Sequence, residues 1–144
     1  MKKIPNLFFV SFMVCLLSLA LYVPNVHAAQ HLVITINNYS NNTVSLAFAR
    51  ENGYNTSDTT TTGWYNCDPG RSRTIKIFNY TKNDNYYWYG ISRGKQFTNG
   101  RDFFGWIKMG TAFKSFNGRK LGGGMHVGFK VLNQKQGIAR INIR

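Results

Sequence analysis

Residues 63–80 read GWYNCDPGRSRTIKIFNY, and this stretch decides the class of the fold. Asp68-Pro69-Gly70 has turn chemistry, because proline presets φ at one turn position and glycine supplies a positive φ at another. The five residues before the turn form a short segment that contains the aromatic residues Trp64 and Tyr65. After the turn, Ile75 and Ile77 alternate with polar side chains, which is the period of a half-buried strand. The stretch therefore predicts two strands joined by a tight turn, the second being the partner of the first.

The same alternation runs through the rest of the chain beyond residue 30, and no sustained helical period interrupts it. It predicts a shared face for Leu32, Ile34 and Ile36, and an inward face for Ala139, Ile141 and Ile143. Eight short strands are expected, at residues 31–37, 43–49, 63–67, 71–80, 85–93, 102–109, 125–133 and 137–144. The first two are predicted to form a hairpin through an asparagine-rich turn. Residues 51–62 are expected to form a mobile polar loop, and residues 110–124 fit no regular element. The predicted class is all-β, a single small sandwich or barrel of about eight antiparallel strands.

Residues 1–28 have the layout of a cleavable secretory signal. Lys2 and Lys3 precede an uncharged apolar run, and Val26-His27-Ala28 carries small residues at the positions that a signal peptidase reads. A retained membrane anchor is the alternative, because a span needs about 20 apolar residues and this run is only slightly shorter. We expect one exported domain, residues 29–144, in the periplasm or the extracellular space of a bacterium.

The expected domain is strongly basic. Residues 29–144 keep 16 of the 18 lysines and arginines and all five acidic residues, which leaves a net charge of +11. Such a field concentrates anions near the surface. Outside the cytoplasm the expected anions are cell-envelope polymers, acidic glycans and lipid head groups, and no specific nucleic acid is expected. The alternative is that the charge serves solubility alone.

Groups suited to catalysis or metal binding are few. Cys67 is the only cysteine in residues 29–144, and no C-x-x-C or H-x-x-x-H spacing occurs, so neither a metal nor a cofactor is expected. His31 lies near the expected new N-terminus, and His126 falls on the outward face of its strand. A nucleophilic Cys67 would need a neighbouring base, whereas a cysteine beside a tight turn is usually a small buried side chain. The sequence favours a protein that is not an enzyme, with no catalytic residue.

Aromatic residues give the candidate binding site. In NYYWYG, Tyr86 and Trp88 share one strand face, while Tyr87 and Tyr89 share the other. Both faces cannot be the core of a simple two-layer fold, so one pair is expected to be exposed or to be covered by residues 110–124. Exposed aromatic rings beside cations suit sugar rings, single-stranded nucleic acid or a lipid interface. The alternative is that NYYWYG is a heavily aromatic strand of the core. The strand at residues 71–80 is expected to pair with the strand at residues 85–93, because only a short loop joins them. This pairing would bring the cations Arg71, Arg73 and Lys76 beside the rings.

TTGWYNCDPGRSRTI followed by NYYWYGIS resembles a bacterial family known only as domain of unknown function ten thirty-six. Its pattern is a Gly-Trp-aromatic strand, a Pro-Gly turn, a basic return strand and a tyrosine-rich strand. Here these features fall on Gly63, Trp64, Tyr65, Pro69, Gly70, Tyr86, Tyr87 and Tyr89. The resemblance covers about residues 32–132, and it implies a small exported β-domain with no established reaction. Tyr65 stands where a second tryptophan is common, and Cys67 is not part of the pattern.

Taken together, these features favour an exported, non-enzymatic β-domain that binds anionic or glycan components of the cell envelope. The binding residues would be Tyr86 to Tyr89 with Arg71, Arg73 and Lys76. One alternative is a membrane-active, toxin-like module that uses the same aromatic residues at a lipid interface. A second alternative is a small secreted hydrolase of the nuclease type, in which His126 would be required.

Overall fold

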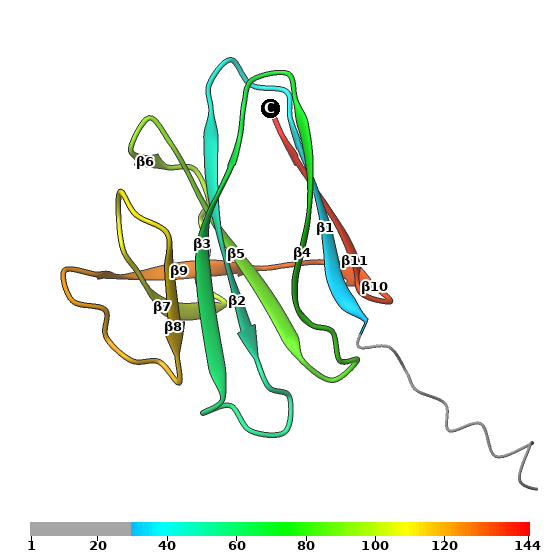
Figure 1. The fold of residues 1–144 in the computed structure, drawn as a ribbon, viewed down its shortest axis with the longest axis vertical. Coiled ribbons are helices and arrows are strands. Elements are labelled where there is room, and N and C mark those ends of the chain that lie inside the picture. Colours follow the sequence, from blue (N-terminus) through cyan, green and yellow to red (C-terminus); the bar gives the residue numbers. More distant parts are fainter. Residues whose placement is uncertain (1–29) are drawn as a thin grey trace, which may run out of the picture.

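The computed structural model describes residues 30–144, and this part of the chain contains strands and turns but no helix (Figure 1). The predicted signal segment lies outside the described residues. The strands are β1 (His31–Asn38), β2 (Val44–Glu51), β3 (Thr59–Cys67), β4 (Ser72–Asn79), β5 (Asn85–Ser92), β6 (Lys95–Gln96), β7 (Phe103–Ile107), β8 (Phe113–Phe116), β9 (Met125–Val131), β10 (Gln134–Lys135) and β11 (Ile138–Ile143). The predicted all-β class is confirmed.

The strands form two sheets. The smaller sheet has the order β10-β11-β1-β4, in which β1 pairs parallel with β11 and antiparallel with β4. The larger sheet has the order β7-β9-β5-β2-β3-β8, and β6 pairs with β5. Figure 1 shows β9 running across the other strands of the larger sheet toward β10 and β11. The larger sheet is therefore strongly curled, and the smaller one covers only one of its faces.

The first core lies between the two sheets. The predicted inward residues of β1, Leu32, Ile34 and Ile36, are fully buried in it, as the period-two pattern requires. Its buried members are Leu32, Ile34, Ile36, Val44, Leu46, Phe48, Cys67, Ile75, Ile77, Tyr86, Leu132, Ala139, Ile141 and Ile143. Both sheets contribute, so this core holds the sandwich together.

A second core lies on the other face of the larger sheet. Its buried members are Ala47, Ala49, Tyr87, Tyr89, Ile107, Phe113, Val127 and Phe129. The small side chains of Ala47 and Ala49 leave room on β2, so β7, β8 and β9 fold back over that face. Tyr87 stacks on Phe103 with 5.0 Å between ring centroids, and Tyr89 packs against Phe129 at 5.7 Å. The curl therefore gives one sheet two buried faces.

Three predicted strand pairings are wrong. Strands β1 and β2 belong to different sheets, and so do β3 and β4, so neither pair is a hairpin. Strand β4 also does not pair with β5, because β4 pairs with β1 whereas β5 pairs with β2. The alternation of a strand specifies which face is buried but not which strand lies beside it. Here the turn at Asp68-Pro69-Gly70 carries the chain from one sheet to the other, so the two apolar faces meet across the core.

Two segments expected to be irregular are strands. The loop predicted at residues 51–62 is shorter, because Thr59, Thr60 and Thr61 are buried in β3. Threonine is β-branched and favours strands, and the Thr61 hydroxyl donates to the carbonyl of Trp106 at 3.1 Å. Residues 113–116, within the segment that fitted no regular element, form β8 at the edge of β3.

The backbone at Gly100 passes so close to β9 that neither Gly100 nor Gly128 has room for a side chain. A Cβ added at Gly128 would overlap the carbonyl of Gly100, and one added at Gly100 would overlap the backbone of β9. We therefore predict that Gly128→Ala lowers the free energy of unfolding by roughly 1–3 kcal/mol, as overpacking does. Urea unfolding of residues 30–144 measures this.

Gly122→Ala is the matched control, because a Cβ at Gly122 meets no atom within 4 Å. Equal stability of the two variants would contradict the close crossing.

Candidate functional site

The structure buries most of the predicted aromatic site. Tyr86 lies in the first core, and Tyr87 and Tyr89 lie in the second, each less than 8% exposed. Burial raises the pKa of all three phenols above its usual range, and the Glu51 carboxylate, which accepts a hydrogen bond from the Tyr87 hydroxyl at 2.9 Å, raises that of Tyr87 further. These three rings therefore have no free face for a ligand. Trp88 is only partly buried.

The predicted cations are exposed, but they do not gather beside Tyr86 and Trp88. Lys76 is exposed on β4, whose partner is β1 rather than β5. Arg73 reaches toward β3, where it donates to the carbonyl of Asn66 at 2.7 Å and lies 6.0 Å from the centroid of Tyr65. Arg71 follows the turn at the end of β3. The predicted site is thus divided between two sheets.

A small cup at one end of the sandwich includes Trp88. Its volume is about 390 Å³, within the usual range for small-ligand pockets. It is lined by Ser40, Asn42, Val44, Trp88, Ser92, Phe97, Asn142, Ile143 and Arg144. The rings of Trp88 and Phe97 lie 6.2 Å apart at 56°, and Phe97 is 39% exposed. Two aromatic rings, short hydroxyl and amide side chains and one guanidinium thus share a single hollow.

Phe97 is placed in this cup by the β5–β6 hairpin. Arg93 and Gly94 both have positive φ, which is the geometry of a tight hairpin turn. The Phe97 N–H donates to the carbonyl of Gly90 at 3.1 Å, and the Phe97 ring occupies the space where a side chain of Gly90 would lie. Sequence analysis did not identify Phe97, because Arg93-Gly94 is not among the asparagine-glycine or aspartate-glycine pairs that signal a hairpin most strongly.

The side chain of Asn38 stabilises the β1–β2 connection, whose residues Ser40 and Asn42 line the opposite side of the cup. This side chain is fully buried, and its Nδ2 donates to the carbonyls of Asn42 and Cys67 at 2.7 and 2.9 Å. Its Oδ1 accepts from the backbone N–H and the hydroxyl of Ser40 at 3.0 and 2.7 Å. Because these bonds are buried or partly buried, they fix the β1–β2 connection firmly. The cup is therefore preformed on both sides.

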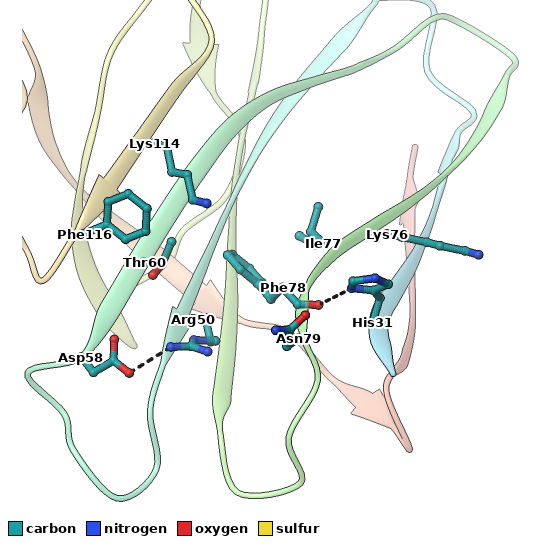
Figure 2. A pocket seen from close by; sticks show the side chains of 10 residues that line it. All are labelled: His31, Arg50, Asp58, Thr60, Lys76, Ile77, Phe78, Asn79, Lys114 and Phe116. Carbon is teal, nitrogen blue, oxygen red and sulfur yellow. Dashed lines mark hydrogen bonds and ion pairs between the residues drawn. The ribbon is translucent and has the colours of Figure 1, made fainter. Parts of the chain in front are cut away.

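A second hollow, of about 440 Å³, lies between β4 and the edge formed by β3 and β8 (Figure 2). Arg50 binds Asp58 at 3.0 Å and the buried Asp84 at 3.7 Å, so it ties two loops together. The ring of His31 donates through Nδ1 to the carbonyl of Phe78 at 3.2 Å. Figure 2 shows His31 and Asp58 on opposite sides, with Lys76 directed away from the hollow. Arg50 and Asp58 thus hold the structure together, whereas Lys76 and Lys114, which also line the hollow, are exposed and form no ion pair with the described carboxylates.

The basic charge is almost entirely free of carboxylate partners. Within residues 30–144 the ion pairs are those of Arg50 with Asp58 and Asp84. The other three carboxylates accept hydrogen bonds from neutral groups: Glu51 from Tyr87, Asp68 from Thr43 and Asp102 from the backbone of Val131. The remaining lysines and arginines therefore present their charge to solvent.

The Cys67 side chain is buried and packs in the core. It is 3% exposed in the first core, and its thiol lies 3.3 Å from the carbonyl of Arg71. Burial raises the pKa of the Cys67 thiol, which lowers the fraction of reactive thiolate. Trp64 packs against the second core and Tyr65 against the first, as partly buried residues. In the described part of the chain, no three residues among His, Cys, Asp and Glu gather where they could hold a metal ion.

Comparison of the chain with family models, curated proteins and solved structures finds no match. The resemblance to domain of unknown function ten thirty-six therefore stays a prediction. Among residues 30–144, no helix is long and apolar enough to cross a membrane.

We predict that Cys67 of folded residues 30–144 reacts at least tenfold more slowly with a soluble disulfide reagent at pH 8 than Cys67 of the same protein unfolded in urea. The reason is that folding buries the thiol and raises its pKa. Thiol release followed by absorbance measures both rates. Equal rates for the folded and unfolded protein would contradict the buried position.

Proposed function

We propose that the protein is an exported, non-enzymatic domain that binds a glycan of the cell envelope carrying anionic groups. The observation that carries this proposal is the cup, in which Trp88 and Phe97 lie beside hydroxyl and amide side chains. A sugar ring has an apolar face of C–H groups and a polar rim of hydroxyls. It therefore matches a hollow that has aromatic walls and a few polar groups.

The polar groups around the cup have hydrogen-bonding capacity left for such a ligand. The Oδ1 of Asn142 accepts from Asn37 at 2.7 Å, which leaves its Nδ2 as a donor. The Ser92 hydroxyl donates to the carbonyl of Thr43 at 3.2 Å, so its oxygen remains an acceptor. Donors and acceptors at the rim suit hydroxyl groups, which can both give and accept hydrogen bonds.

Charge favours an acidic glycan over a neutral one. Arg144 lines the cup, and none of the lining residues is acidic. A guanidinium can hold a carboxylate with two parallel hydrogen bonds. The unpaired cations elsewhere on the surface would raise the local concentration of a polyanion and speed its capture. The proposal therefore assigns recognition to the cup and long-range attraction to the basic surface.

We predict that residues 30–144 co-sediment with peptidoglycan, whose sugar rings carry acetamido groups and whose peptide stems carry carboxylates. Phe97→Ala removes one aromatic wall, and Arg144→Gln removes the cation. Each should weaken retention roughly tenfold, which is about 1.4 kcal/mol. Rising salt should weaken retention further, because exposed charges are screened within about 8 Å at physiological ionic strength. The bound fraction across a concentration and salt series measures these effects.

Matched controls are available for both changes. Phe116 is 52% exposed and lines the other hollow, and Arg140 lies four residues before Arg144 on the outward face of β11. Phe116→Ala and Arg140→Gln should retain binding apart from the small effect of one lost charge. Equal loss in variant and control would contradict recognition in the cup. Release of soluble sugar fragments by the wild-type protein would favour the hydrolase alternative.

A further inference from the structure

A second exposed aromatic group lies on the outer face of the β7–β9 pair, outside the cup. We call Phe104, Trp106, His126 and Lys120 the aromatic strip. Trp106 and His126 are cross-strand partners, with ring centroids 5.0 Å apart, and Phe104 lies 5.9 Å from His126. The Lys120 Nζ lies 5.5 Å from the centroid of Trp106. Phe104 is 55% exposed and His126 is exposed, while Trp106 is partly buried, so the strip itself is open to solvent.

The composition of the strip is unusual for a solvent-facing sheet surface. The inward neighbours Phe103, Ile107 and Phe129 already supply the second core, so the outward rings are not needed to bury it. Exposed apolar side chains gathered on one face typically mark an interaction surface.

The charge around the strip is positive. Lys120 lies over the indole, and Arg119 beside it in the chain is exposed. The carboxylate of Asp102, at the start of β7, accepts from the backbone N–H of Val131 at 2.8 Å. An occupant of this surface must therefore offer an apolar layer for Phe104 and Trp106 and negative charge for the cations around them.

We propose that the aromatic strip docks on the surface of an anionic lipid bilayer. Tryptophan favours the boundary between head groups and acyl chains, where its ring meets apolar matter and its N–H meets water. Phe104 reaches the upper acyl region. Lys120 and Arg119 pair with anionic head groups, and each basic residue near such a surface adds about 1 kcal/mol. Docking is peripheral, and the cup at the end of the sandwich stays open.

The direct test is sedimentation of residues 30–144 with vesicles of phosphatidylcholine alone and of phosphatidylcholine with 30% phosphatidylglycerol. These residues contain both cores of the fold. We expect retention on the anionic vesicles, little on the neutral ones, and release by salt. Phe104→Ala should weaken retention roughly tenfold, given the area of one phenyl ring. Lys120→Gln should weaken it roughly fivefold, which is the loss of one surface cation.

Phe116→Ala is the matched control for Phe104→Ala, because Phe116 is exposed to a similar extent as Phe104 and has a lysine over its ring. Lys135→Gln is the control for Lys120→Gln, because Lys135 is exposed on β10. Absence of retention on anionic vesicles would overturn the proposal, and so would equal losses in the variants and the controls. Dye release from the vesicles would overturn peripheral docking. The vesicle result does not depend on Phe97, so failure of glycan binding in the cup leaves it unaffected.

Discussion

Strand β5 is packed on both faces, and most of the architecture follows from this constraint. Tyr86 faces the smaller sheet, whereas Tyr87 and Tyr89 face the other way and need a second cover. Burial of each such side chain contributes about 1.5–3 kcal/mol, so leaving this face in water would cost a large part of the stability of a domain this small. Strands β7, β8 and β9 supply the cover by folding back, and Ala47 and Ala49 on β2 give them the room to do so.

The same constraint determines where a ligand can bind. Because three of the four aromatic residues of β5 are used in the cores, recognition is left to the aromatic side chains at the ends and on the outer face of the curled sheet. Trp88 meets Phe97 at one end, and Trp106 meets His126 on the outside. The cations remain free throughout, because Arg50 alone forms ion pairs among residues 30–144. A basic surface with two separate aromatic sites suits a protein that works among anionic polymers and lipids.

The all-β class and the inward face of each strand could be predicted from the sequence, because alternation depends only on which side of a strand is buried. Leu32, Ile34 and Ile36 on β1, and Ala139, Ile141 and Ile143 on β11, lie as the pattern predicts. Strand partners could not be predicted, since the turn at Asp68-Pro69-Gly70 can join strands within one sheet or between two. The separation of the predicted site residues between two sheets could not be predicted for the same reason. Tyr86 and Tyr87 were correctly placed on opposite faces, but a simple two-layer fold does not provide a core for each, and a curled sheet does.

Nitration of folded residues 30–144 with tetranitromethane, followed by peptide mapping, tests the double burial of β5 most directly. Tyr39 and Tyr54 are 64% and 84% exposed and should be modified first. Tyr86, Tyr87 and Tyr89 should be spared until the protein is unfolded, because burial both excludes the reagent and raises the pKa of each phenol. If Tyr87 or Tyr89 were modified as fast as Tyr39 in the folded protein, the second core would be contradicted. Strand β5 would then again be a candidate binding surface.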